Sequence, residues 1–198
     1  MMEQKLKKLL LEALQEDCPT IDVTSELMLA KNQQGKAKLI AKEKGVFFGQ
    51  EIIEAVFEVL EASVLIVWHK KNGDEVIPQS LICEVEGPQQ AILKAERILL
   101  NFVQHLSGVA SLTRRFVEAL GQPKIQILDT RKTTPLQRAL ERKAVVAGGG
   151  FNHRLNLSDM VLIKENHLAN FLARHQPKDL GPTLSAYKKQ NSGIAIEI

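Results

Sequence analysis

Three short apolar runs in the second half of the chain are separated by helix-length segments. They occupy residues 125–128, 160–163 and 194–198, and charged residues lie at or beside their carboxyl ends. Apolar, β-branched runs of this length predict buried strands, and their alternation with helices predicts a parallel β-α-β-α-β series. Such folds bind ligands at the carboxyl ends of their strands. The pattern therefore predicts an α/β region with a charged binding rim.

The charges at this rim favour an anionic ligand. Residues 127–167 contain seven Lys or Arg and only four acidic residues. Arg131 and Lys132 follow the first run closely, Lys164 ends the second, and Glu197 lies in the third. A single cation at a strand end is often only a surface residue, but charges at three strand ends favour a common site.

A helix is expected over 135–147, directly after the first cations. Thr134 fits its N-cap, Pro135 fits its first position, and Gly148 ends it. A helix N-terminus presents unpaired N–H groups and partial positive charge, which suit a carboxylate or a phosphate. This arrangement places Arg131 beside a second source of positive potential.

Four motifs, in this order, resemble those of the quinolinate phosphoribosyltransferase family. They are Glu96-Arg-x-x-Leu-Asn101, Thr130-Arg-Lys-Thr-Thr-Pro135, Gly148-Gly-Gly-x-Asn-His-Arg154 and Asp159-Met-Val-Leu-Ile-Lys-x-Asn-His167. Several long motifs in one order are more specific than a lone glycine-rich loop. The resemblance extends over nearly the whole chain, from Glu16, Asp17 and Asp22 to the last apolar run.

The resemblance implies a glycosyltransferase of NAD biosynthesis. Family members transfer the phosphoribosyl group of phosphoribosyl pyrophosphate (PRPP) to quinolinate, with Mg²⁺ and with loss of CO2. The products are nicotinate mononucleotide and pyrophosphate. Quinolinate carries two adjacent carboxylates, and Arg131 and Arg154 can each grip one through two parallel bonds, as a lysine cannot.

The resemblance also implies roles for individual residues. Those expected to bind the pyridine dicarboxylate are Thr130, Arg131, His153 and Arg154, with Arg97 supplied by the partner subunit of a homodimer or larger homo-oligomer. Those expected to act in catalysis are Lys132 and Lys164, facing the pyrophosphate or a substrate carboxylate, and Glu197, facing the ribose hydroxyls or the metal. Arg138 is a further candidate for the same anionic pocket.

The first half of the chain predicts helices packed on a mostly antiparallel sheet. Expected elements are an amphipathic N-terminal helix, strands within 36–48, 63–69 and 81–85, a helix over 50–62 and a hairpin turn at 72–73. A long helix over 89–120, broken at 107–108, is expected to connect the halves. Trp68 is expected to pack against the sheet. The fold class is α/β: a sandwich-like α+β domain over 1–110, then a partial α/β barrel over 111–198.

Composition disfavours several other classes of protein. The net charge of +3, without basic runs interleaved with aromatics, gives no support for nucleic-acid binding. No apolar run approaches the ~20 residues of a membrane span. Cys18 and Cys83 are too few for a disulfide framework and favour reduced thiols in the cytoplasm. His153 and His167 lack the spacing of a zinc site.

Length leaves alternatives open. A closed (β/α) barrel needs about 250 residues, whereas this chain has 198, so a C-terminally shortened and inactive form is expected. One alternative is a related phosphoribosyltransferase acting on nicotinate or another acidic ring. Another is a non-catalytic, dimerising fragment.

Three positions depart from the family pattern. Leu136 stands where relatives usually carry Gly, Lys143 where they often carry Tyr, and Ala195 where they often carry Glu. Each lies beside an expected functional residue without replacing one. The departures therefore concern fine specificity rather than the class of reaction.

Overall fold

The computed structural model describes residues 2–198 and divides into two compact units. The first unit holds the chain up to Asp129 together with Thr133–Phe151. The second unit holds Thr130–Lys132 and Asn152–Ile198. The domain boundary at residue 110 stays a prediction.

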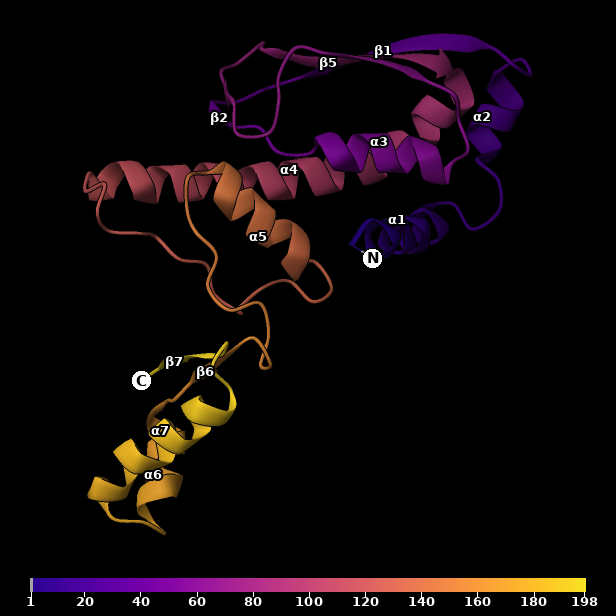
Figure 1. Cartoon of the computed structure of the whole chain (residues 1–198). Coiled ribbons are helices and arrows are strands. Elements are labelled where there is room, and N and C mark those ends of the chain that lie inside the picture. Colours follow the sequence, from indigo (N-terminus) through magenta and orange to yellow (C-terminus); the bar gives the residue numbers. More distant parts are fainter. Residues whose placement is uncertain (1) are drawn as a thin grey trace. The chain divides into compact units, whose positions relative to one another are not determined.

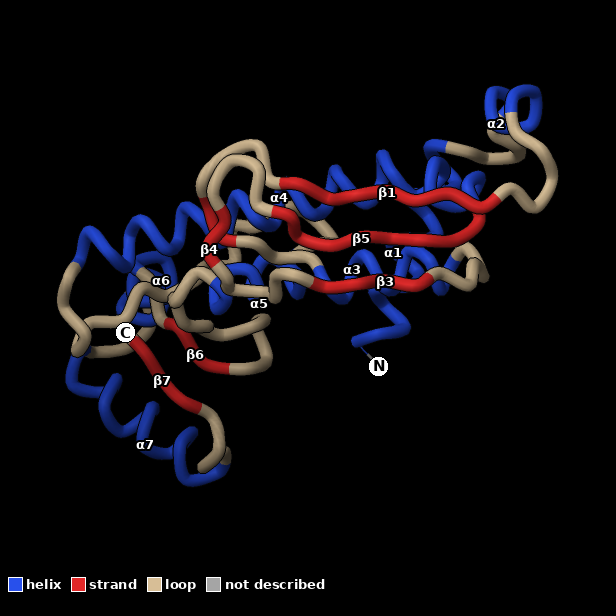
Figure 2. Tube along the Cα trace, turned by 90° about the horizontal axis from the view of Figure 1, so that it is seen from above, coloured by secondary structure: helices blue, strands red, loops and turns tan. Residues whose placement is uncertain are grey.

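The first unit contains a three-stranded antiparallel sheet (Figure 2). Its strands lie in the order β1 (Gln34–Ile40), β5 (Leu81–Pro88) and β3 (Leu65–Trp68). A separate antiparallel pair is formed by β2 (Gly45–Val46) and β4 (Glu75–Val76). The predicted mostly antiparallel sheet is confirmed.

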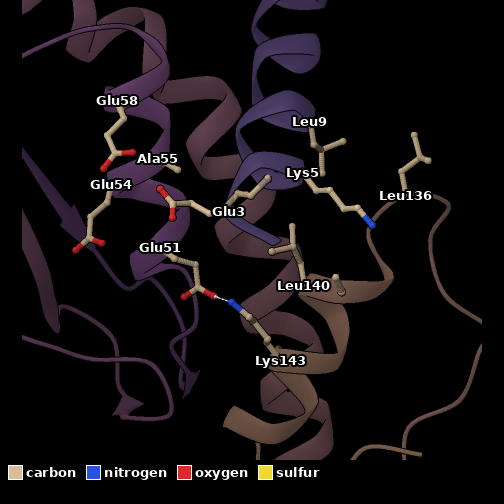
Figure 3. Close-up of a pocket in the computed structure, with 12 residues that line it drawn as sticks. Glu3, Lys5, Leu9, Glu51, Glu54, Ala55, Glu58, Leu136, Leu140 and Lys143 are labelled. Atoms are coloured by element: carbon tan, nitrogen blue, oxygen red, sulfur yellow. Dashed lines mark hydrogen bonds and ion pairs between the residues drawn. The ribbon is translucent and has the colours of Figure 1, made fainter. Parts of the chain in front are cut away.

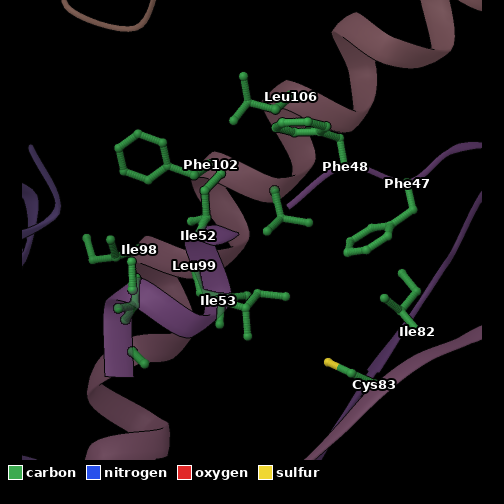
Figure 4. Close-up of a cluster of buried hydrophobic side chains, with 14 of the residues drawn as sticks. Phe47, Phe48, Ile52, Ile53, Ile82, Cys83, Ile98, Leu99, Phe102 and Leu106 are labelled. Atoms are coloured by element: carbon green, nitrogen blue, oxygen red, sulfur yellow. The ribbon is translucent and has the colours of Figure 1, made fainter. Parts of the chain in front are cut away.

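Helices α3 (Gln50–Val59) and α4 (Gln89–Leu120) cover one face of this sheet (Figure 1). On the side of these helices away from the sheet, α1 (Met2–Asp17) packs against α3 and α4, and α5 (Arg138–Ala147) packs against α4. The apolar faces of α3 and α4 meet in a core with the inner face of the sheet (Figure 4). Trp68 lies against this core at 6.3 Å from the ring of Phe47, as predicted for a packing residue.

Two predictions for the first unit are wrong. The long helix has no break at Ser107-Gly108, because the hydroxyl of Ser107 donates to the carbonyl of Phe48 and the apolar stripe continues to Ala110. Asn72-Gly73 is a turn, but the strands on either side of it pair elsewhere. Instead, Asn72 Oδ1 accepts the backbone N–H groups of Gly49 and Gln50, at 2.8 and 3.1 Å, and so caps α3.

A short helix was missed near the N-terminus. Residues 18–25 predict a polar connection, yet α2 spans Val23–Met28. Asp22 is its N-cap and accepts the N–H groups of Thr24 and Ser25, each at 3.1 Å. The Asp-x-x-Ser spacing is therefore the sequence signal for this helix.

The second unit is a parallel strand–helix–strand arrangement. Strand β6 (Met160–Leu162) pairs in parallel with β7 (Ala195–Glu197). Between them lie α6 (Glu165–Leu172), the 3-10 helix η1 (Pro177–Asp179) and α7 (Leu180–Gln190). With the α+β first unit, this gives the predicted α/β class and the elements of an α/β-barrel domain.

The first predicted strand of this series is wrong. Leu128 forms only an isolated parallel bridge with Phe151, and Ile125 is 59% exposed. The following helix begins at Arg138 rather than at Pro135, and its N-cap is Gln137 rather than Thr134. Leu136 adopts a left-handed backbone with φ of 66°, which cannot continue a right-handed helix.

No helix among residues 2–198 is both long enough and apolar enough to cross a membrane.

Candidate active site

The second unit collects most of the predicted site residues. It contains Thr130, Arg131, Lys132, His153, Arg154, Lys164 and Glu197. The short segment Thr130–Lys132 belongs to this unit although Thr133–Phe151, which separates it from Asn152 in the sequence, belongs to the first unit. Seven of the predicted site residues therefore belong to one compact unit, and their common role stays a prediction.

His153 and Glu197 are directly paired. His153 Nε2 lies 2.8 Å from Glu197 Oε2, and the two side chains are 18% and 52% exposed. The pairing of β7 with β6 fixes the backbone of Glu197 opposite Leu162. A carboxylate can only accept, so this bond places a proton on Nε2 of the imidazole.

Arg154 is buried and held by the backbone. It is 9% exposed, and its Nη1 donates to the carbonyl of Met160 at 3.1 Å. Met160 is the first residue of β6, so the strand holds one end of the guanidinium in place. A planar group oriented in this way can present its remaining fork to a carboxylate.

The cation at the end of β6 is also well placed. Lys164 is exposed and precedes α6, and its backbone N–H donates to His167 Nδ1 at 3.0 Å. The histidine thereby closes the first turn of the helix, while the ammonium group of Lys164 extends into solvent as a compact charge.

The loop that carries Arg131 and Lys132 contains a local turn. Thr130 Oγ1 accepts the backbone N–H of Lys132 at 3.1 Å. Arg131 is half-buried and Lys132 is exposed. The threonine side chain thus stabilises a local turn at the start of the cationic segment.

Comparisons with known proteins agree with this arrangement. Residues 22–107 match the model for the N-terminal domain of quinolinate phosphoribosyl transferase, and residues 109–179 match that for its C-terminal domain. The nicotinate-nucleotide pyrophosphorylase of Ehrlichia chaffeensis is 36% identical, with a TM-score of 0.82 over 96% of this chain and 68% of that one. The chain belongs to the quinolinate phosphoribosyltransferase family.

Two further relatives are similar over most of this chain. NadC from Streptococcus pyogenes is 38% identical, with a TM-score of 0.87 over 94% of this chain and 66% of that one. The probable nicotinate-nucleotide pyrophosphorylase (carboxylating) of Bacillus subtilis is 46% identical over 165 residues. That alignment covers 83% of this chain and 57% of the Bacillus protein, so the chain spans little more than half of that relative.

Two predicted site residues of this family member lie in the first unit. Arg97 is exposed on α4. Arg138 begins α5, and its Nε donates to Thr133 Oγ1 at 3.2 Å.

Sequence reasoning missed a buried carboxylate beside the Thr-Arg-Lys-Thr-Thr-Pro motif. Glu141 of α5 is 8% exposed and lies 2.8 Å from His105 Nε2 of α4. Burial acts to raise the pKa of its carboxyl, but hydrogen bonds from Thr134 and His105 outweigh burial and hold the pKa below its ordinary value. The available signal was an acidic residue among the apolar positions of α5, next to Leu140 and one turn before Ala144.

The first unit also contains a cleft of about 410 Å³ between α1, α3 and α5 (Figure 3). Leu9, Ala55 and Leu140 contribute apolar surface to the cleft. Lys143, which stands where relatives often carry Tyr, forms an ion pair there: its Nζ lies 2.8 Å from Glu51 Oε1. Its acidic lining residues are Glu3, Glu51, Glu54 and Glu58. Lys5 and Lys143 also line the cleft, and Lys7 pairs with both Glu3 and Glu58, so most of these carboxylates are paired.

The carboxylates of the second unit are the residues of that unit with the chemistry to contact a Mg²⁺ ion. Among residues 2–198, no group of three or more His, Cys, Asp or Glu side chains could hold a metal ion. Mg²⁺ is commonly bound through one or two carboxylates together with substrate phosphates. Glu197 is one carboxylate of the second unit that could contribute to such a site.

Proposed function

We propose that this chain carries the dicarboxylate-binding part of an enzyme that makes nicotinate mononucleotide from quinolinate and PRPP. Family membership supports the reaction class. The observation that carries the proposal is the set of forked and compact cations in one unit, with Arg154 held by the strand that ends beside Lys164.

Recognition of quinolinate rests on two arginines and a histidine. Arg131 and Arg154 each bind one carboxylate of the ring through paired, charge-assisted bonds. His153 is oriented by Glu197, and Thr130 shapes the loop before Lys132. A nicotinate ring has only one carboxylate and leaves one arginine without its partner, which disfavours it as a substrate.

Charge separation governs the transfer step. The bond between ribose C1 and the pyrophosphate oxygen breaks, and the ring nitrogen of quinolinate forms the new bond to C1. Lys132 and Lys164 stabilise the negative charge that develops on pyrophosphate, while Glu197 favours the positive charge on the ribose. Mg²⁺ bound to the phosphates shields their charge. The adjacent carboxylate then leaves as CO2, its bonding electrons enter the pyridinium ring, and a proton replaces it.

Arg97 completes the proposed site from the partner subunit of a homodimer or larger homo-oligomer.

A location in the cytoplasm, where thiols stay reduced, is also proposed for the protein. Its two cysteines include one that is buried, Cys83, and neither forms a disulfide in the structure.

Calorimetric titration of the 198-residue chain with quinolinate, beside nicotinate, tests the proposal. Quinolinate should bind at least tenfold more tightly, since a charge-assisted hydrogen bond contributes about 1.5–3 kcal/mol. R154K should lose most of this preference because an ammonium cannot form the paired bonds. R174K, at an exposed arginine of the second unit, is the matched control and should bind like the wild type.

Three outcomes would contradict the proposal. Equal affinities for the two acids would favour a phosphoribosyltransferase of another acidic ring. A wild-type R154K affinity would remove the arginine from the site. A folded dimer without heat from either ligand would favour a non-catalytic assembly role.

A further inference from the structure

Glu141 is a buried charge that the proposed chemistry does not use. It lies on α5 and is 8% exposed. Its buried neighbours on this helix, Leu140 and Ala144, are apolar, so a charged side chain here is unexpected. Burying an ionised carboxylate is unfavourable unless its oxygens are satisfied. Its partners therefore indicate what it does.

One partner is the backbone of the motif. The N–H of Thr134 donates to both carboxylate oxygens of Glu141, each at 3.3 Å. Thr134 follows Lys132 by two residues, and a residue spans at most ~3.6 Å of chain. Fixing this amide therefore limits how far Arg131 and Lys132 can move.

A second tether acts on the same segment. Arg138 Nε donates to Thr133 Oγ1 at 3.2 Å, one residue before the amide that Glu141 holds. Both tethers originate in α5, which lies against α4 through Leu140 and Ala144. The motif is thus fixed to a helix whose own position is set by the core.

The other partner, His105, fixes the carboxylate. Its Nε2 lies 2.8 Å from Glu141 Oε1, and its side chain is 41% exposed, against 11% for Glu141. Because an ionised carboxylate only accepts, His105 donates from Nε2. Thr134 and His105 together leave the Glu141 side chain little freedom to rotate.

We propose that Glu141 is a positioning residue that anchors residues 130–134, so that Arg131 and Lys132 are preorganised for an anionic substrate. The identity of that anion rests on the proposed function, but the anchoring does not. Positioning matters because a shift of about 1 Å in a reacting group can lower a rate about 100-fold. A loosened but intact loop should bind quinolinate about tenfold more weakly.

Three variants of the full chain separate anchoring from stability. E141L keeps the volume but accepts no hydrogen bond, so it releases Thr134. E141Q keeps an oxygen that can accept the Thr134 N–H and is the conservative rescue. H105L removes the hydrogen bond from His105 to Glu141 but keeps the apolar contact between α4 and α5 and the bond from Thr134 to Glu141.

Two measurements are made on samples shown to be folded by circular dichroism. Hydrogen exchange of residues 130–136 should accelerate at least tenfold in E141L and by less than threefold in E141Q and H105L. Quinolinate affinity should fall about tenfold in E141L and stay within threefold of wild type in the other two. All three variants are expected to melt at lower temperature, so melting alone does not separate the two roles.

The results of these measurements test the anchoring role of Glu141 separately from the proposed substrate. If exchange in E141L matches that of H105L, Glu141 only joins α4 to α5 and the proposal is overturned. If the wild type binds no quinolinate, the proposed substrate is wrong, while the exchange rates still decide whether Glu141 anchors the loop. Fast exchange in E141L with unchanged affinity would show that the loop needs no anchor to bind.

Discussion

Asp129 and Arg142 form a buried ion pair that ties the entrance of the Thr-Arg-Lys-Thr-Thr-Pro motif to α5. Arg142 Nη1 lies 3.1 Å from one carboxylate oxygen of Asp129 and 3.2 Å from the other, and the side chains are 12% and 5% exposed. The backbone N–H of Asp129 also donates to the carbonyl of Phe151 at 3.0 Å. The segment 130–134 is therefore held on both sides.

Removal of one partner of this pair should be costly. D129A leaves the guanidinium of Arg142 buried without its carboxylate, which should lower the free energy of unfolding by about 3–5 kcal/mol. Urea unfolding followed by circular dichroism measures the change. The double variant D129A/R142A should be less destabilised than the sum of the single variants. Additive losses would mean that the two charges do not stabilise each other.

Leu136 stores strain at the entrance to α5. Its φ of 66° is unfavourable for any residue with a Cβ, and its side chain is 83% exposed, so little packing offsets the strain. L136G should be more stable than L136A by about 1 kcal/mol, because both variants lose the side chain but only glycine relieves the backbone. Urea midpoints of the two variants measure this difference. An equal midpoint would show that the loop relaxes without cost.

Glu141 should make the stability of the protein sensitive to acid. Its folded pKa is below the ordinary 4.5, so its contribution is fully present above that value and is lost as the pH falls through the folded pKa. Unfolding free energies of E141Q should therefore fall less than those of the wild type between pH 6 and about pH 3. E54Q, at an exposed residue of α3, should keep the wild-type pH dependence. Parallel profiles for wild type and E141Q would contradict this assignment.

The two cysteines should differ in reactivity. Burial raises the pKa of the Cys83 thiol to about 11, and the residue is 1% exposed, whereas Cys18 is half-buried. A thiol reagent at pH 8 should label Cys18 in the folded protein and Cys83 only after unfolding. C18S should take up no label while folded. Rapid labelling of C18S would show that the sheet opens locally at β5.

Patterns with one clear period predicted most of the fold. The apolar spacing of 50–62 predicted α3, and alternating runs predicted the strands of the antiparallel sheet. The parallel pair of β6 and β7 was predicted from runs that end in charge. Each of these elements buries one face or lies within a sheet. The spacing of its apolar residues therefore shows which side chains are buried.

The errors arose where a tertiary contact overrides a local signal. Ser107-Gly108 suggested a helix break, but the Ser107 hydroxyl bonds to Phe48, which is distant in sequence. Thr134-Pro135 suggested a helix start, but the left-handed backbone of Leu136 delays the helix to Arg138, and Glu141 accepts the amide of Thr134. Asn72 suggested a hairpin and instead caps α3. None of these partners can be identified from the local sequence alone.

The residues of the candidate site stay predictions, whereas the strand expected before them is wrong. Family motifs identified Arg131, His153 and Arg154, and the second unit contains all three. Their ligands and roles stay predictions. Glu141 was missed because it lies outside the cationic pattern and acts on backbone rather than on a ligand.

The continuity of α4 limits how this protein can be divided. Its 32 residues span about 48 Å at 1.5 Å per residue, and buried side chains continue along it from Ile92 to Thr113. A cut near residue 110 would divide the helix inside this run of buried side chains, between Leu106 and Thr113. The two halves of the chain therefore cannot be exchanged between relatives as independent modules, and insertions that evolution tolerates should accumulate outside this helix.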